Sequence, residues 1–362
     1  MRIVFDGRES GTTSGRYVDK LLENLMQVDR ENDYILLLKK HRLAAYNDLP
    51  KNFRAIECNI KEFTFGEQLK LPFIIRRQKP DLVHFPFVQQ PIFYFGRAVT
   101  TMQDLTTLRF TNPTKQRLKF WLMQRAYWLV NMIAIRKSKA ILTPTEFVKH
   151  DVQKTLHHHR PEKITVTLES ADAISAMPEE VRELVGKDYI MYVGRHQPHK
   201  NLERLIDAFA LIQKSRPKLY LAIVGKPDAT TELLAKKYAH VAQIVYTGFV
   251  SEGQLRWLYE HTQAYVFPSL SEGFGLPPLE AMHHGAPVVA SNASCIPEVC
   301  GEAALYFSPY SVKDMAMAIL DVLNNKRLKV ALIQKGKKRV GQFSWRRMAA
   351  QTLDVYKQVL GK

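Results

Sequence analysis

The sequence has few cysteines, no long apolar run and a shortage of acidic residues. Its 362 residues include only Cys58, Cys295 and Cys300, which are too few for a disulfide framework and whose spacing matches no metal-binding pattern. A membrane-spanning helix needs about 18 consecutive apolar residues, and no such run occurs. Because Met1 leads directly into an apolar segment, a secretory signal peptide is not expected, and a reducing cytoplasm is the predicted setting.

The shortage of acidic residues leaves the chain strongly basic. It has 52 Lys and Arg against 35 Asp and Glu, a formal net charge of +17. Such a charge favours an anionic partner. The three classes of partner that fit are nucleic acid, a membrane surface and a phosphorylated substrate. No recognisable nucleic-acid-binding motif accompanies the charge, so nucleic acid is not expected as a partner.

Short apolar segments alternate with helix-length segments along the whole chain, which is typical of a parallel sheet covered by helices. Because the pattern restarts at Tyr189, we expect an α/β protein with two Rossmann-like, doubly wound domains and a ligand cleft between them. The predicted domains are 1–170 and 171–345, joined by a polar stretch around 168–188, with a helix at 346–362 that packs back on the first domain. The predicted strands lie at 2–7, 33–38, 53–58, 81–86, 98–105, 139–145, 190–195, 219–225, 243–249, 264–269, 287–292 and 304–309.

Glycines and charged or polar residues follow many of these predicted strands. In open α/β sheets, ligands bind beyond the carboxyl ends of the strands, so these positions are candidate site residues. A series of them in both halves is hard to explain by turns alone. They are Gly15 and Arg16, Gln103 and Asp104, Gly194 and Arg195, Gly225 and Lys226, Thr247 and Phe249, and the stretch 269–275.

The segment SEGFGLPPLEAMHHGAPVV, residues 271–289, indicates a glycine turn followed by a short helix. Pro277 and Pro278 suit the start of a helix, and Gly285 suits its end. His283 and His284 are expected to finish the helix. A helix N-terminus offers free N–H groups and partial positive charge, which favour a phosphate.

Two glutamates flank this predicted phosphate site. A carboxylate facing the phosphate would repel it, so Glu272 and Glu280 are expected to accept hydrogen bonds from hydroxyls on either side. That pattern indicates a ligand with hydroxyls at both ends, such as a nucleotide sugar. The alternative is that the two carboxylates merely complement the helix dipole, worth about 0.3 to 1 kcal/mol.

These segments resemble the retaining, nucleotide-sugar-dependent glycosyltransferases of the GT-B fold, the group 1 or mannosyltransferase-like family. The resemblance covers nearly the whole chain, and its most specific part is SEGFGLPPLEAMHHGAPVVASNASCIPEVCGEAALYF. Weaker parts are GRHQPHKNLERLIDAF, VYTGFVSEGQLRWLYEHTQAYVFPS and SGRYVDKLLENL.

The resemblance implies roles for matching residues. Glu280 resembles the glutamate that binds the donor ribose, and Glu272 resembles the one that contacts the sugar ring. Arg195 and Lys200 resemble the basic pair that grips the diphosphate, and fixed cations there would stabilise the charge of the leaving group. The remaining implied donor contacts are Gly273, Phe274, Gly275 and Leu276 near the sugar and diphosphate, Gly194, Gly225 and Lys226 at the strand ends, Thr247 and Phe249 near the base, and Gly15 and Arg16 in the loop that closes over the phosphates or meets the acceptor.

One position departs from the family pattern. Many relatives carry a histidine directly before the aspartate at Asp104, where this chain has Gln103, which cannot exchange a proton near neutral pH. A retaining mechanism needs only a hydrogen bond here, because the leaving phosphate itself can accept the acceptor's proton. The chain has no Asp-x-Asp pair, which fits a metal-independent enzyme in which Arg195 and Lys200 replace the divalent cation.

The stretch from Lys115 to Lys139 contains seven Lys or Arg, no acidic residue and several aromatic residues. It is either an interfacial helix on an anionic membrane or a core helix with a basic outer face. The apolar segment 85–96 adds a second candidate for membrane or acceptor contact. The expected location is therefore the cytoplasm, on the inner face of the cell membrane.

The resulting expectation is a retaining, metal-independent enzyme that transfers a hexose to a lipid-linked or cell-surface glycan. Mannose from GDP-mannose is favoured, a UDP-hexose is the other donor considered, and no cofactor beyond the donor is expected. The alternatives are a nucleotide-sugar-binding protein that has lost catalysis, motivated by Gln103, and a sugar-nucleotide epimerase or inverting transferase on the same fold.

Overall fold

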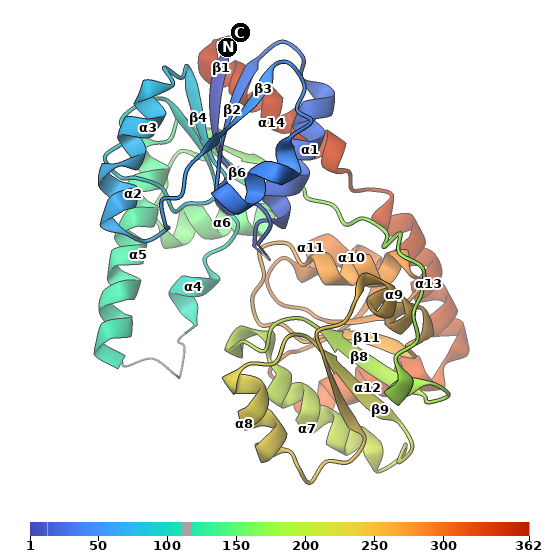
Figure 1. The fold of residues 1–362 in the computed structure, drawn as a ribbon. Helices are drawn as coiled ribbons and strands as arrows, with labels where there is room; N and C mark the ends of the chain where they lie inside the picture. The colour runs from blue at the N-terminus through green and yellow to red at the C-terminus, as the bar shows by residue number, and fades with distance from the viewer. Residues whose placement is uncertain (13, 111–116, 362) are drawn as a thin grey trace. The chain divides into compact units, whose positions relative to one another are not determined.

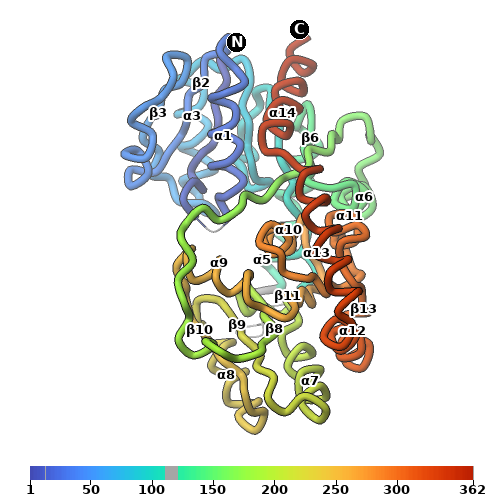
Figure 2. The backbone as a smooth tube through the Cα atoms, turned by 90° about the vertical axis from the view of Figure 1, so that its right-hand side faces the viewer, coloured from blue at the N-terminus to red at the C-terminus, as the bar shows by residue number. Residues whose placement is uncertain are grey.

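The computed structural model describes residues 1–12, 14–110 and 117–361 (Figure 1). The chain divides into two compact units, one made of Met1–Glu169 with Ser344–Lys362 and the other of Ser170–Phe343. The chain therefore leaves the first unit once and returns to it for its last helix, which Figure 2 shows in red beside the blue N-terminal segment. Among the described residues, none of the helices combines the length and the apolar character needed to cross a membrane.

The first unit is built on a seven-stranded parallel sheet with the order β3-β2-β1-β4-β5-β6-β7. Every predicted strand of this half is present. The strand β7 was missed because its three residues are too short to make a clear apolar run. The strands are β1 Arg2–Asp6, β2 Asp33–Leu38, β3 Phe53–Glu57, β4 Leu82–Phe85, β5 Ala98–Thr101, β6 Ala140–Thr143 and β7 Ile164–Val166.

Helices cover this sheet, and the last helix of the chain lies alongside the first. Tyr356 of the last helix bonds through its hydroxyl to Nδ1 of His84 on β4 at 2.5 Å. Nε2 of His84 bonds in turn to Thr101, and burial lowers the pKa of His84 to about 3. The helices are α1 Arg16–Val28, α2 Phe65–Leu69, α3 Leu71–Arg77, α4 Thr106–Arg109, α5 Arg117–Lys137, α6 Glu146–Thr155 and α14 Trp345–Leu360, with 3₁₀ turns η1 Lys40–Tyr46 and η2 Pro161–Lys163.

The second unit holds a six-stranded parallel sheet with the order β10-β9-β8-β11-β12-β13. The strands are β8 Tyr189–Val193, β9 Tyr220–Val224, β10 Ile244–Gly248, β11 Ala264–Phe267, β12 Val288–Ser291 and β13 Ala304–Phe307. The helices are α7 Leu202–Gln213, α8 Ala229–Lys237, α9 Glu252–His261, α10 Leu276–His283, α11 Ile296–Cys300, α12 Val312–Asn324 and α13 Lys326–Val340, with 3₁₀ turns η3 Arg182–Leu184, η4 Pro198–Lys200 and η5 Gly301–Ala303.

Both sheets are parallel and doubly wound, which confirms the predicted α/β, Rossmann-like architecture. In each sheet the strand order reverses at one place, between β1 and β4 in the first and between β8 and β11 in the second. Loops leaving the carboxyl ends of strands diverge at such a reversal, and ligands of open α/β sheets bind there. The loops after β8 and β11 carry most of the predicted donor-site residues.

Candidate active site

Two glycines bring the loops after β8 and β9 into backbone contact. Gly225 has φ +158°, and a Cβ added to it would lie 2.3 Å from the carbonyl oxygen of Gly194. A Cβ on Gly194, where φ is +150°, would lie 2.7 Å from the hydroxyl of Tyr192. No L side chain fits at either position without displacing its neighbour, so both glycines are needed for this close approach.

An ion pair joins the loops after β8 and β11. Nζ of Lys200 lies 2.7 Å from Oε1 of Glu272, and the two side chains are only 17% and 13% exposed. The sequence analysis predicted both as site residues but did not predict that they touch. Arg195 is exposed at the start of the loop that contains Lys200.

Asn201 holds this loop in place, and the sequence analysis did not identify it. It adopts a left-handed conformation with φ +60°, and its amide donates to the carbonyl oxygens of Pro268 at 3.1 Å and Pro309 at 2.8 Å. In addition, the Leu270 N–H donates to the carbonyl oxygen of His199 at 2.7 Å. The signal that could have found Asn201 is its position directly before a helix, where a short amide side chain tolerates positive φ.

The glycine turn that carries Glu272 is fastened from the segment before α11. The Glu272 N–H donates to Oγ of Ser294 at 3.1 Å. Sγ of Cys295 donates to the carbonyl oxygens of Glu272 at 3.2 Å and Phe274 at 3.3 Å. Burial raises the pKa of the Cys295 thiol well above its usual range, so it remains a protonated donor. Cys295 therefore orders the turn as well as filling space.

The start and end of α10 are as predicted. Gly275 precedes the helix with φ +91°, and no side chain caps it. Because Pro277 and Pro278 have no N–H, Leu276 is the residue among the first three helical positions that can offer an N–H to an anion. His283 is the last helical residue and His284 follows it. Within the helix Glu280 is 5% exposed, and the hydroxyl of Tyr259 donates to its Oε2 at 3.3 Å.

His196 is a further buried polar residue at this edge that the sequence analysis missed. Its Nδ1 bonds to Thr231, while Nε2 has no hydrogen-bond partner in the described chain. A Cβ on Gly225 would lie 3.3 Å from this nitrogen, which places it beside the two close-packed glycines. Burial lowers the pKa of His196, so the ring is neutral at pH 7 and can bond to a donor or an acceptor.

The predicted base-contact residues lie at the end of β10. Thr247 is half-buried and Phe249 is 83% exposed. A register shift between β9 and β10 falls at 246–248, where the ladder ends. Lys226 is exposed at the end of β9.

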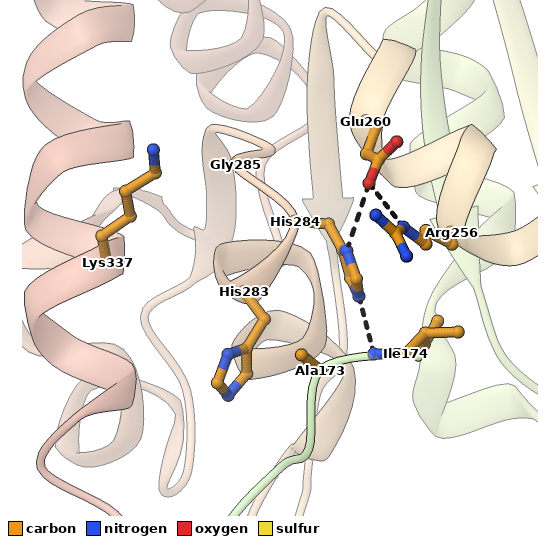
Figure 3. A pocket seen from close by; sticks show the side chains of 8 residues that line it. All are labelled: Ala173, Ile174, Arg256, Glu260, His283, His284, Gly285 and Lys337. Carbon is orange, nitrogen blue, oxygen red and sulfur yellow. Dashed lines mark hydrogen bonds and ion pairs between the residues drawn. The ribbon is translucent and has the colours of Figure 1, made fainter. Parts of the chain in front are cut away.

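The stretch 168–188 was predicted to connect the two domains. Part of it is held by hydrogen bonds to side chains of the second unit (Figure 3). Nε2 of His283 bonds to the carbonyl oxygen of Ala171 at 2.9 Å, and Nε2 of His284 accepts from the Ile174 N–H at 2.9 Å. Arg256 donates to the carbonyl oxygen of Ala176 at 3.1 Å. These contacts fasten the start of the stretch to α9 and α10. The cavity beside them has a volume of about 370 Å³ and is lined by Ala173, Ile174, Arg256, Glu260, His283, His284, Gly285 and Lys337.

In the first unit, the predicted site residues lie at the carboxyl edge of the sheet. Gly15 precedes α1, and a Cβ there would lie 1.7 Å from the carbonyl oxygen of Glu9, so only glycine fits. Arg16 begins the helix and is half-buried. Thr13 of the same predicted loop lies outside the described residues. After β5, Gln103 and Asp104 are half-buried, and Asp104 accepts from the Thr106 N–H at 2.7 Å.

Large apolar side chains are exposed on α2, α3 and α5 and on the loop after β4. The three helices lie along one side of the first unit (Figure 1). Hydrogen bonds join the loop to α2 through Gln68 and to α5 through Lys137. The rings of Phe63 and Tyr127 lie 6.4 Å apart, which places the loop before α2 next to α5. We call this the aromatic face; its exposed members are Phe63, Phe65, Leu69, Phe73, Phe93, Phe95, Trp121, Leu122, Met123 and Leu129.

The helix α5, which covers most of 115–139, is partly buried and partly exposed, and its contact with a membrane stays a prediction. Trp121, at 51% exposed, faces solvent, whereas Ala134 and Ile135 are buried in the core. Residues 115 and 116 lie outside the described chain. The segment 85–96 is likewise mixed, because Phe95 is 76% exposed and Tyr94 is buried.

Comparison with known proteins identifies the family. Residues 175–339 match the family described as Glycosyl transferases group 1. Over 297 residues the chain is 30% identical to O-antigen chain mannosyltransferase B of Escherichia coli, a match that covers 78% of this chain and 76% of that protein. The chain belongs to the group 1 glycosyltransferases.

Other known proteins match this glycosyltransferase either over part of the sequence or in fold. It is 33% identical over 210 residues to the serotype-specific mannosyltransferase WbdA of Escherichia coli, covering 55% of this chain but only 25% of that longer protein. Sucrose-phosphate synthase from Thermosynechococcus elongatus has the same fold, with a TM-score of 0.77, 18% identity and coverage of 100% and 99% of the two chains. WaaG, a glycosyltransferase involved in lipopolysaccharide biosynthesis, matches with a TM-score of 0.72, 16% identity and coverage of 98% and 99%.

Proposed function

We propose that this glycosyltransferase transfers mannose, with retention of configuration, from GDP-mannose to a lipid-linked or cell-surface glycan. The observation that carries the proposal is the contact between Lys200 and Glu272 beside the open N-terminus of α10. It puts a cation, a hydroxyl acceptor and the positive end of a helix dipole at one end of the second sheet. The names of the two Escherichia coli relatives support mannose as the transferred sugar.

The chemistry follows from the charge that develops during transfer. As the bond between the sugar and the diphosphate breaks, negative charge grows on the leaving phosphate. Lys200, Arg195 and the N-terminus of α10 would stabilise that charge, because fixed positive groups cost no reorganisation when the reaction occurs. With this positive charge already supplied by the chain, we propose that the reaction needs no divalent metal.

Glu272 has two roles in the proposed site. Its ion pair holds the flexible Lys200 side chain where the diphosphate binds, and its second carboxylate oxygen can accept a hydrogen bond from a sugar hydroxyl. The leaving phosphate accepts the proton of the acceptor hydroxyl. Gln103 is compatible with this mechanism because the mechanism does not require its side chain to transfer a proton.

We further propose that the protein works on the inner face of the cell membrane. The aromatic face is bordered by exposed Arg76, Arg77 and Arg125. Aromatic rings favour the interfacial layer of a bilayer, and each basic residue near anionic lipid is worth about 1 kcal/mol. An acceptor carried by a lipid would thereby be brought to the enzyme.

Purified protein should be assayed with GDP-mannose, GDP-glucose and UDP-glucose, with a mannose-terminated oligosaccharide as acceptor. We expect turnover with GDP-mannose and an α-linked product by NMR. Preference for another donor would overturn the assignment of mannose. Donor binding without transfer or hydrolysis would instead support the alternative that Gln103 motivates, a nucleotide-sugar-binding protein without catalysis.

A further inference from the structure

Glu280 is a buried carboxylate that a tyrosine of the preceding helix holds by a hydrogen bond. It lies within α10 and is 5% exposed, and the hydroxyl of Tyr259 on α9 donates to its Oε2 at 3.3 Å. A glutamate side chain has several rotatable bonds and is mobile when nothing holds it. A hydrogen bond to one of its oxygens therefore restricts the direction in which the whole carboxylate points.

The ring of Tyr259 is itself held from two sides. The ring of Tyr265 on β11 meets it edge-on, with centroids 5.7 Å apart. The ring of His284, directly after α10, lies parallel to it within 4°, with centroids 6.1 Å apart. Tyr259 is fully buried, and close packing of this kind keeps a side chain in one rotamer. Its hydroxyl therefore meets Glu280 from a fixed direction.

His284 is fixed in turn by two further contacts (Figure 3). Its Nε2 accepts from the Ile174 N–H at 2.9 Å, and its Nδ1 lies 3.7 Å from Oε1 of Glu260. Burial lowers the pKa of His284, so the ring is neutral at pH 7 and carries its hydrogen on Nδ1, toward Glu260. Contacts within the second unit thus lead from Ile174 through His284 and Tyr259 to Glu280.

The orientation of Glu280 matters because this residue is expected to bind the ribose of the donor. A carboxylate that already points at its ligand loses less conformational freedom on binding than a mobile one, and the ligand binds more tightly. A residue that only orients this carboxylate contributes equally to the bound ground state and the transition state. Its loss should therefore raise KM for the donor and leave kcat nearly unchanged.

We propose that Tyr259 is a positioning residue that orients Glu280 toward the donor ribose, and that His284 holds the Tyr259 ring in place. The inference rests on the proposed function, in which the donor is a nucleotide sugar, and on the ribose contact expected of Glu280. It adds two residues that act on donor binding through Glu280 and need no contact with the donor themselves.

The test compares the wild type with Tyr259→Phe, Glu280→Ala and the double variant. The probes are GDP and 2′,3′-dideoxy-GDP, which lacks both ribose hydroxyls, and calorimetric titration measures the Kd of each. We expect the wild type to prefer GDP by about tenfold or more, Glu280→Ala to lose most of that preference, and Tyr259→Phe to reduce it about threefold or more. The double variant should lose no more than Glu280→Ala alone, because Tyr259 acts through Glu280.

Tyr238→Phe is the matched control. The hydroxyl of Tyr238 donates to the carbonyl oxygen of Glu203, also at 3.3 Å, and Tyr238 is 6% exposed in the same unit. This variant should leave the preference for GDP and KM for GDP-mannose unchanged. Tyr259→Phe should raise KM for GDP-mannose about threefold or more, with kcat within about twofold of the wild type.

His284→Gln tests the second residue and replaces Tyr259→Phe if that variant does not fold. Glutamine keeps an acceptor for the Ile174 N–H but removes the ring that lies against Tyr259. We expect the preference for GDP over 2′,3′-dideoxy-GDP to fall about twofold or more. An unchanged preference in His284→Gln would overturn the role of His284.

An unchanged preference for GDP in Tyr259→Phe, even with a lower melting temperature, would overturn the inference and leave Tyr259 with a structural role. Equal weakening of GDP and 2′,3′-dideoxy-GDP would overturn it as well. If Glu280→Ala keeps the preference, Glu280 does not bind the ribose and the inference is overturned with that contact.

Wild-type turnover with GDP-mannose tests the proposed function separately. If the wild type uses a UDP-hexose instead, the same comparison with UDP and 2′,3′-dideoxy-UDP decides whether Tyr259 positions Glu280.

Discussion

Lys200 and Glu272 lie 72 positions apart in the chain, and their charged atoms are 2.7 Å apart. The pair forms because a 3₁₀ turn after β8 and a glycine turn after β11 leave adjacent strands of the second sheet. Glu280 lies one turn or more into α10, is more deeply buried, and bonds to Tyr259 instead. The two glutamates therefore have different surroundings and should respond differently to substitution.

We predict that Glu272→Ala mainly lowers kcat, by about 10²- to 10³-fold, because it frees Lys200 and removes a contact that strengthens as charge develops. Glu280→Ala should mainly raise KM for the donor, because a ribose contact is the same in the ground and transition states. Steady-state kinetics with varied GDP-mannose measures both effects.

Glu302→Ala is the control for these variants, because Glu302 is exposed and pairs with Lys335 at the surface of the same unit. It should leave both constants unchanged. Small and equal effects of Glu272→Ala and Glu280→Ala would contradict the assignment of separate roles.

Activity should be unaffected by excess chelator. The reason is that Arg195 and Lys200 are proposed to supply the positive charge that a divalent ion supplies elsewhere. Transfer rates measured with and without EDTA, after dialysis against it, check this expectation. Loss of activity that Mg²⁺ or Mn²⁺ restores would show that the basic residues do not suffice.

The protein should bind anionic vesicles at low salt and dissociate as salt is raised, because surface charge is screened over about 10 Å at 0.1 M salt. The double variant Phe65→Ser with Phe73→Ser should bind about tenfold more weakly, since both rings are more than 70% exposed on the aromatic face. Cosedimentation with anionic and neutral vesicles measures both effects.

The matched control is Met317→Ser, which removes a side chain 58% exposed on α12 of the second unit. It should not change vesicle binding. Binding that ignores lipid charge, or that both variants weaken equally, would argue against the aromatic face as the membrane surface.

Tyr356→Phe should lower the free energy of unfolding by about 1 to 3 kcal/mol, because it leaves Nδ1 of buried His84 without its partner. Urea denaturation compares it with Tyr310→Phe, in which an exposed tyrosine loses the same hydroxyl. Equal stability of the two variants would mean that this bond does not hold α14 to the sheet.

The arrangement of elements could be predicted because it depends on local pattern. Alternating apolar and helical segments identified every strand except the three-residue β7, and Gly275, Pro277 and Gly285 marked the ends of α10. The single compact motif around Glu272 and Glu280 likewise indicated a site because its parts are adjacent in sequence.

Relationships between distant segments could not be read in this way. Nothing local to Cys295 indicates that its thiol donates to the turn after β11, and nothing local to Asn201 indicates its bonds to Pro268 and Pro309. The hydrogen bond between His283 and the carbonyl oxygen of Ala171 also joins segments that are distant in the sequence, and no local pattern indicates it. Each depends on which strands pair, and the strand order of a parallel sheet is set by packing over the whole unit.

The sequence by itself thus determined the two parallel sheets, the glycine turns and the family of this enzyme, since each is written in neighbouring residues. Only the tertiary structure decided that Lys200 pairs with Glu272, and that Glu169 lies buried at the carboxyl edge of the first sheet. The physical reason is that hydrogen bonding, burial and pKa depend on what surrounds a side chain in space, and those neighbours come from strands far apart in the chain.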